Sequence, residues 1–107
     1  MEAVKSLQKV TTVAELDAVL QRQPSVTVLV YATWCPYCMR FLPVFTKHAQ
    51  GREEFVLAED NSEAIAEEYE VEIIPTVLRF EKGRIVARLD GTPGIGLNET
   101  QLLEFLR

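Results

Sequence analysis

The chain has 107 residues, a length that fits one compact domain over residues 1–107 and leaves no room for a second. Its composition, 48% hydrophobic and 25% charged, is that of a globular protein and not of a disordered or fibrous one. The net charge of −5 argues against a nucleic-acid partner, because phosphates favour clustered Lys and Arg. The longest apolar stretch, residues 26–32, is far shorter than the roughly 20 residues of a membrane-spanning helix, so no membrane partner is expected.

The first residues carry information about location. Residues 1–5 lack the basic, apolar and small-residue pattern of a secretion signal. We therefore expect a cytoplasmic protein.

The N-terminal part of the chain shows a strand pattern followed by a helix pattern. Residues 4–10 are the first predicted strand. Thr12-Val13-Ala14-Glu15 is a capping box, in which Thr and Glu three residues apart begin a helix. Leu16 and Leu20 lie four residues apart in this helix, which ends at Gln23-Pro24-Ser25.

The middle of the chain repeats this alternation. Residues 26–31 are a continuous run of β-branched and aliphatic side chains, typical of a parallel strand buried on both faces. A helix is predicted from the following cysteines onward, because apolar side chains recur at helical spacing at Phe41, Leu42 and Phe45. Residues 55–58 are a third strand, and Asp60-Asn61-Ser62 offers N-cap residues for a helix through Tyr69.

The C-terminal part predicts a hairpin and a last helix. Residues 76–80 and 84–89 read as two strands joined by a turn at Lys82-Gly83. Asn98-Glu99-Thr100-Gln101 resembles a capping box, and the inner side of its helix carries Leu102, Leu103 and Leu106. The order βαβαβαββα predicts an α/β fold, with a mixed sheet covered by helices on both faces.

The two cysteines of the chain lie together in Trp34-Cys35-Pro36-Tyr37-Cys38, directly after the predicted buried strand. Two thiols separated by two residues can close and reopen a small disulfide ring. A structural zinc site needs about four ligands, and the chain adds only a distant His48, which we interpret as a surface residue of the helix. A structural disulfide here would close a loop too short to stabilise the fold much. The motif therefore predicts reversible thiol–disulfide exchange, with no metal and no cofactor.

The two cysteines have different predicted roles. Cys35 lies at the start of the helix, where unpaired N–H groups and the helix dipole favour an anion, so we assign it as the nucleophile. Cys38, one turn further along, is expected to be less exposed. It would resolve the mixed disulfide by attacking Cys35 and releasing reduced product.

With these motifs in place, the chain resembles a thioredoxin nearly from end to end. The resemblance rests on the CxxC at a strand-to-helix junction, on Tyr31-Ala32 before it, and on Pro43, Ile74-Pro75-Thr76, Phe80-Glu81-Lys82-Gly83, Gly91 and the final Leu102-Leu103-Glu104-Phe105-Leu106. It implies the thioredoxin fold and a dithiol–disulfide oxidoreductase. Such a protein carries electrons to disulfide-containing proteins and is recharged by a reductase such as a thioredoxin reductase.

The resemblance also assigns residues around the cysteines. Pro75 resembles the family's cis-proline, which leaves the backbone of Ile74 free to pair with an extended substrate. Trp34, with Pro36 and Tyr37, is expected to form an exposed docking surface, and Gly91 matches a glycine of the family's substrate-contact surface. Asp60 would either accept a hydrogen bond from the Trp34 indole or cap the next helix.

Four departures from the family pattern bear on function. Pro36-Tyr37 between the cysteines is similar to the dipeptide of glutaredoxins, so we expect a more oxidising couple than in a standard thioredoxin. Leu29 and Val56 replace the family's buried Asp and its Lys, so Cys38 would lose its proton to water, Glu59 or Asp60. Arg79 occupies a strand position that is usually apolar, which predicts a carboxylate partner or a solvent-reaching head group. The loop of residues 92–97 is longer than usual, which suits either partner choice or a tolerated insertion.

Two other functions remain open at this point. A glutaredoxin acting on glutathione mixed disulfides is disfavoured, because the chain has Tyr31-Ala32-Thr33 where those proteins carry a Lys, and only Gly91-Thr92 where they carry Gly-Gly. A module of a different class would be a dimer that pools Cys35 and Cys38 around an iron–sulfur cluster, although Pro36 and Tyr37 offer no extra ligand. We expect a monomer, with the apolar surroundings of Trp34 as the surface for any self-association.

Overall fold

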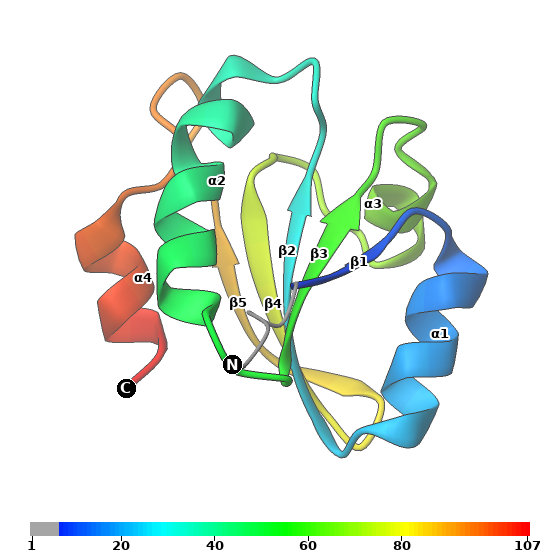
Figure 1. The fold of residues 1–107 in the computed structure, drawn as a ribbon. Coiled ribbons are helices and arrows are strands. Elements are labelled where there is room, and N and C mark those ends of the chain that lie inside the picture. Colours follow the sequence, from blue (N-terminus) through cyan, green and yellow to red (C-terminus); the bar gives the residue numbers. More distant parts are fainter. Residues whose placement is uncertain (1–6) are drawn as a thin grey trace, which may run out of the picture.

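The computed structural model describes residues 7–107, which form one five-stranded sheet flanked by four helices (Figure 1). The strands are β1 (Gln8–Val10), β2 (Ser25–Tyr31), β3 (Phe55–Glu59), β4 (Thr76–Glu81) and β5 (Arg84–Asp90). The helices are α1 (Val13–Arg22), α2 (Pro36–Ala49), α3 (Ala64–Glu68) and α4 (Glu99–Phe105). The predicted order βαβαβαββα is confirmed. No helix within residues 7–107 is long and apolar enough to cross a membrane.

The sheet has the strand order β1-β3-β2-β4-β5, with β2 in the centre. β3 runs parallel to both β1 and β2, whereas β4 runs antiparallel to β2, and β5 antiparallel to β4. Six of the seven residues of β2 are buried, because both of its faces are covered by helices. The β4–β5 turn at Lys82-Gly83 has φ of 53° and 81° at its two residues, a backbone that favours Gly at the second.

The helices divide into two layers, α1 and α3 on one face of the sheet and α2 and α4 on the other (Figure 1). Each layer closes its own apolar core. On the first face, Leu16 of α1 and Ile65 of α3 pack on the valines of β2. On the second face, Phe41 and Phe45 of α2 pack with Leu102 of α4. After the carboxyl end of β2 the chain enters α2, and the first turn of this helix places Cys38 in the second core.

Several sequence expectations need correction. The first strand is seen at Gln8–Val10, while residues 4–6 of the predicted strand lie outside the described residues. Helix α3 is shorter than predicted, because Glu63 at its start has a left-handed backbone with φ of 68°. The capping box of α1 is only half formed. Thr12 accepts the Glu15 N–H, but the Glu15 carboxylate accepts the N–H of Thr11, one residue too early.

The C-terminal expectations are mostly confirmed. Asn98 and Gln101 form the reciprocal hydrogen bonds of a capping box on α4. Leu102 of this helix is fully buried, whereas Leu103 is 45% exposed and does not belong to the inner side. Arg79 has the carboxylate partner that its position predicted, with its Nε 3.4 Å from Glu81 Oε2.

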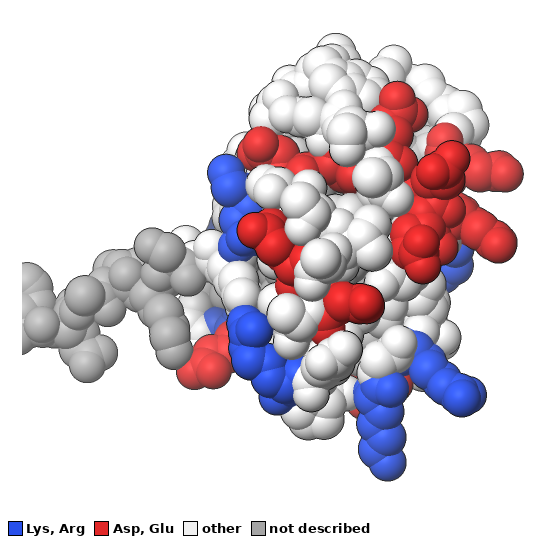
Figure 2. Space-filling model, turned by 90° about the vertical axis from the view of Figure 1, so that its right-hand side faces the viewer, with Lys and Arg blue, Asp and Glu red and all other residues white. Residues whose placement is uncertain are grey.

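Surface charge is distributed unevenly. Figure 2, which faces the side of the molecule with α1 and α3, shows acidic side chains gathered in its upper right part and basic ones toward its lower edge. Five exposed glutamates lie in and around α3, at positions 63, 67, 68, 70 and 72. The surface beside this helix is therefore acidic.

Candidate active site

The cysteines are placed by the junction between the central strand and the longest helix. β2 ends at Tyr31, and the chain turns so that the Cys35 N–H donates to the Ala32 carbonyl at 3.3 Å. Cys35 is the N-cap of α2 and Pro36 is its first helical residue, where a missing N–H costs nothing. This arrangement puts the first sulfur in front of the unpaired N–H groups of a 14-residue helix.

The Cys35 sulfur lies between the helix and the loop before β4. Its Sγ accepts the Cys38 N–H at 3.3 Å, and the thiol donates to the Ile74 carbonyl at 3.8 Å. The N–H and the helix dipole both favour negative charge on this sulfur. Cys35 is 6% exposed, at the floor of a groove.

Cys38 lies behind Cys35 in the core of the α2 face. It has no exposed surface, and both thiols are free in this structure. Burial raises the pKa of the Cys38 thiol to about 12, with a smaller contribution from the hydrogen bond to Cys35. The expected difference in exposure is confirmed, and Cys38 stays protonated until a reaction intermediate requires otherwise.

The loop before β4 presents backbone to Cys35. The Ile74-Pro75 bond is cis, as the resemblance implied. Among residues 7–107 the Ile74 N–H has no hydrogen-bond partner, and the carbonyl of Ile74 accepts only the Cys35 thiol. Ile74 thus offers one donor and one acceptor beside the sulfur.

Gly91 supports this loop from the end of β5. It is buried, and a Cβ added there would lie 2.5 Å from the Pro75 carbonyl oxygen. Only glycine permits this close approach of two backbones. The structure thus shows Gly91 packing against Pro75, and its contact with substrate stays a prediction.

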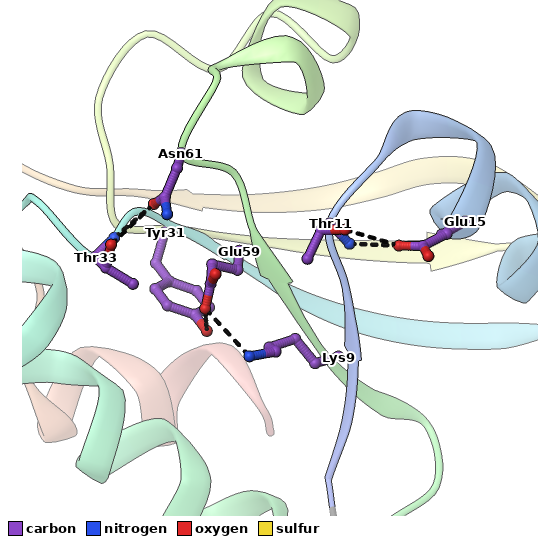
Figure 3. Close-up of polar contacts among 7 residues, drawn as sticks. All are labelled: Lys9, Thr11, Glu15, Tyr31, Thr33, Glu59 and Asn61. Carbon is purple, nitrogen blue, oxygen red and sulfur yellow. Dashed lines mark hydrogen bonds and ion pairs between the residues drawn. The ribbon is translucent and has the colours of Figure 1, made fainter.

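Trp34 is 56% exposed, which agrees with its expected place on the surface next to Cys35. Its indole N–H donates to the Asn61 carbonyl at 3.2 Å, so the alternative of a bond to Asp60 is wrong. The Asn61 side chain accepts the N–H of Thr33 at 2.8 Å, as Figure 3 shows. Sequence reasoning missed this role of Asn61, because it treated the residue as an N-cap candidate alone.

Asp60 is buried and caps α3, which was the other alternative. Its two carboxylate oxygens accept the N–H groups of Ile65 at 2.8 Å and Ala66 at 2.7 Å. The cap reaches α3 from further upstream than a standard N-cap residue, across the left-handed Glu63. Both oxygens are therefore engaged in holding a helix.

Tyr37, between the two cysteines, packs against the loop of residues 92–97. Gly96, in the long loop, has φ of 83° and lies so close that a Cβ there would be 3.1 Å from the Tyr37 Cβ. On α2, the Arg40 guanidinium lies 5.4 Å from the centre of the Tyr37 ring. The loop of residues 92–97 therefore packs on the residue between the cysteines. The glycines at 94 and 96 were the sequence signal for this tight loop.

A groove of about 400 Å³ runs past Cys35. Its lining includes Trp34 and Tyr37, the segment 71–74, and Thr92-Pro93-Gly94 of the loop 92–97. The charged side chains that line it are all acidic, namely Asp60, Glu63 and Glu72. A second hollow, near Phe55 and Ala49 at the other end of the sheet, holds neither cysteine.

The described residues contain no group of three His, Cys, Asp or Glu side chains suited to a metal ion. His48 is partly exposed on α2, and its Nε2 lies 2.6 Å from Glu99 Oε2, which joins α2 to α4. Glu59, at the end of β3, accepts hydrogen bonds from the Tyr31 hydroxyl and the Lys9 ammonium group.

Comparison with known proteins agrees with this geometry. The family model described as "Thioredoxin" matches residues 7–106. The chain belongs to the thioredoxin family. Members of this family are thiol–disulfide oxidoreductases, and a CxxC with one sulfur at a helix N-terminus and one behind it supplies that chemistry. The predicted fold and enzyme class are confirmed.

Individual relatives fit the same family. A thioredoxin of Mycoplasmoides gallisepticum is 33% identical over 88 residues, which cover 79% of this chain and 88% of that protein. Protein disulfide-isomerase A5 of Bos taurus is 37% identical over 93 residues, or 81% of this chain, but the match spans only 17% of that longer protein. The crystal structure of oxidised mitochondrial thioredoxin 3 from Saccharomyces cerevisiae has a TM-score of 0.73 and 29% identity, with 92% of each chain covered.

Proposed function

We propose that this thioredoxin-family protein reduces disulfide bonds in other proteins, with Cys35 as the nucleophile and Cys38 as the resolving thiol. The observation that supports this most is the Ile74 N–H, which has no hydrogen-bond partner among residues 7–107 and lies in the loop whose Ile74 carbonyl accepts the Cys35 thiol. A substrate segment in extended conformation would pair with Ile74 and bring its own sulfur to Cys35. Trp34, Pro36, Tyr37 and Pro75 would form the surrounding contact surface.

The reaction proceeds by two exchanges. The Cys35 thiolate attacks one sulfur of the substrate disulfide, forms a mixed disulfide and releases the second substrate sulfur as a thiolate. The Cys38 sulfur, after losing its proton, attacks Cys35 and releases the first substrate sulfur. The protein is left with a Cys35–Cys38 disulfide, and a reductase such as a thioredoxin reductase would supply two electrons to reopen it. A cytoplasmic location, as a single-domain monomer of residues 1–107, suits this role because thiols stay reduced there.

Trapping of the mixed disulfide tests this assignment. In the Cys38→Ser variant the resolving thiol is absent, so incubation with insulin should leave a covalent adduct at Cys35 that a reductant removes. The matched Cys35→Ser variant should form no adduct, because Cys38 is buried and protonated. Adduct formation by Cys35→Ser at an equal rate would reverse the two assignments, and a lack of adducts in both variants would contradict disulfide exchange with proteins.

The reduction potential tests the effect of Pro36-Tyr37. We propose a more oxidising couple than in a standard thioredoxin, because the dipeptide between the cysteines tunes the stability of the thiolate. Equilibration of the pair against glutathione, followed by Trp34 fluorescence, measures the potential. A potential at or below that of a standard thioredoxin would contradict this proposal, and a Pro36→Gly, Tyr37→Pro double variant provides the internal reference.

Glutathione mixed disulfides are the alternative substrate, which the glutaredoxin-like Pro36-Tyr37 favours. The groove argues against it, because its charged residues are acidic and glutathione carries two carboxylates. Rates on a glutathionylated peptide and on insulin separate the two functions. Faster turnover of the glutathionylated peptide would favour the glutaredoxin-like activity, whereas iron and visible colour in the purified protein would indicate a cluster-bridged dimer.

A further inference from the structure

The second exchange requires Cys38 to lose a proton inside the core. On the sheet face that α2 covers, Leu29 is fully buried and has no group that could accept a proton. Each carboxylate oxygen of Asp60 accepts one backbone N–H of α3, so protonation of Asp60 would weaken the cap of that helix. A different acceptor for the Cys38 proton is therefore favoured.

Three side chains form a row across the same face of the sheet, one from each of three adjacent strands. Tyr31 of β2 and Glu59 of β3 are direct partners in the parallel register. The Tyr31 hydroxyl donates to Glu59 Oε1 at 3.2 Å, and Lys9 Nζ of β1 donates to the same oxygen at 3.3 Å. Figure 3 shows the Glu59 carboxylate between the Tyr31 hydroxyl and the Lys9 ammonium.

Exposure increases along this row from the core to the edge of the sheet. Cys38 is 0% and Tyr31 3% exposed, whereas the side chains of Glu59 and Lys9 are 23% and 49% exposed. Tyr31 and Cys38 belong to the same buried cluster. The row therefore connects the interior that holds the thiol with water at the edge strand.

The pKa of the Tyr31 hydroxyl depends on burial and on the charges of Glu59 and Cys38. The pKa of Tyr31 is raised to about 12, mainly by burial, then by the Glu59 charge and its hydrogen bond, and also by charge on Cys38. A hydroxyl that keeps its proton while bonded to a carboxylate can pass a proton on without becoming an anion. Cys38 also has the Cys35 sulfur beside it, and a hydrogen bond with the Ala32 backbone opposes the rise in the pKa of its thiol. Val77 of β4 and Leu102 of α4 are apolar members of the same buried cluster.

We propose that Tyr31 and Glu59 carry away the proton of Cys38 during the resolving step. As the Cys38 sulfur bonds to Cys35 and the bond from Cys35 to the substrate sulfur breaks, the Cys38 proton passes, directly or through one water molecule, to the Tyr31 oxygen. The Tyr31 proton passes to Glu59 Oε1, and the electron pair leaves on the substrate thiolate. Glu59 then returns its proton to water at the sheet edge, and Lys9 is the positioning residue that holds its carboxylate. This inference rests on the proposed function.

Single-turnover kinetics with Ellman's reagent, a small aromatic disulfide, tests the proposal. Attack by Cys35 releases the first thionitrobenzoate, and attack by Cys38 on the mixed disulfide releases the second, so the two steps appear as separate phases. Tyr31→Phe and Glu59→Gln should each slow the second phase about 10²-fold at pH 7, the lower end for loss of a general base. The double variant should be no slower than either single one, and the first phase should be unchanged in all.

The pH profile separates proton transfer from a structural role. In both variants the second phase should gain speed with rising pH and approach the rate of the original protein, because hydroxide replaces the lost acceptor. Glu15→Gln is the matched control, since Glu15 accepts the N–H and hydroxyl of Thr11 in the same region of the molecule (Figure 3) and should leave both phases unchanged.

Three outcomes would overturn the proposal. If the second phase and its pH profile are unchanged in either variant, water receives the proton of Cys38. If the second phase is slowed equally at every pH, the altered residue has a structural role. A double variant with multiplied effects would show two separate roles. Failure of the proposed function is distinct from these, because it would appear as the absence of insulin adducts in the Cys38→Ser variant, in which Tyr31 and Glu59 are unaltered.

Discussion

The two faces of the sheet are built alike but differ in one respect. The face under α1 and α3 is closed by apolar residues, including Leu16, Val28 and Ile65. The face under α2 and α4 has an equally apolar interior at Phe41 and Phe45, but the buried end of its core contains Cys35, Cys38 and Tyr31. Packing alone therefore explains the core of the first face. The core of the second face also contains two thiols and a hydroxyl, at the end where the disulfide chemistry takes place.

The largest expected effects come from a carboxylate placed in each face. Leu29 and Val28 are neighbours in β2, both fully buried, and they point to opposite faces. Leu29→Asp and Val28→Asp should each lower the free energy of unfolding by about 3–5 kcal/mol at neutral pH, the cost of an unpaired buried charge. Only Leu29→Asp should also speed the resolving step, because only that carboxylate lies on the Cys38 face.

The pH dependence of these two variants has a definite sign. Burial raises the pKa of the new carboxyl group in the folded state above its unfolded value of about 3.9. Stability is therefore retained at low pH and lost as pH rises through the folded pKa. Urea unfolding between pH 4 and 8 checks the sign, and a faster resolving step in Val28→Asp would contradict the difference between the faces.

A second pair of variants removes one aromatic ring from each face. Phe41 in α2 and Phe80 in β4 are both 1% exposed. Phe41→Ala and Phe80→Ala should each cost about 3–5 kcal/mol in urea unfolding, through lost burial and the cavity left behind. The rate of the resolving step in the folded protein should change only in Phe41→Ala, since Phe41 lies one turn after Cys38. Equal changes in both would show that the faces are coupled through the sheet.

The buried thiol gives a pH effect that belongs to the second face alone. The pKa of Cys38 is raised from 9 to about 12, so its protonated form stabilises the folded state. This stabilisation is present below pH 9 and is lost as pH rises through about 12. Alkylation with iodoacetamide followed by mass spectrometry should modify Cys35 but not Cys38 at pH 8. Modification of both thiols at similar rates would show that Cys38 is accessible and deprotonated.

The smallest effects should come from one surface carboxylate on each face. The pKa of Glu15 is lowered by hydrogen bonds from Thr11, first from its N–H and then from its hydroxyl, whereas that of Glu99 is lowered first by Lys47 and then by His48. Both contributions to stability are present above the unfolded pKa and are lost as pH falls. Glu15→Gln and Glu99→Gln should each lower the melting temperature slightly at pH 7. Added salt should reduce the effect only for Glu99, whose partners include charged groups.

Much of the fold was predictable because its signals are local. The buried run of β2, the N-cap residues Thr12 and Asn98 and the Lys82-Gly83 turn each depend on neighbours in the chain. The left-handed Glu63 gave no such signal, so α3 was predicted too long. The residue type of Asp60 showed that it could cap a helix. Tertiary packing decided that Asp60 accepts the Ile65 N–H, whereas the Asn61 carbonyl accepts the Trp34 indole N–H.

The sequence by itself determined the order of elements, the CxxC at a helix N-terminus and the proline before β4. These features depend on periodicity, capping residues and motif spacing, which involve only residues close together in the chain. The tertiary structure decided which distant residues meet. The strand order β1-β3-β2 sets Lys9, Glu59 and Tyr31 side by side, although they are far apart in the sequence. The same is true of Gly96 on Tyr37. Such contacts depend on strand register and loop packing, which single positions do not encode.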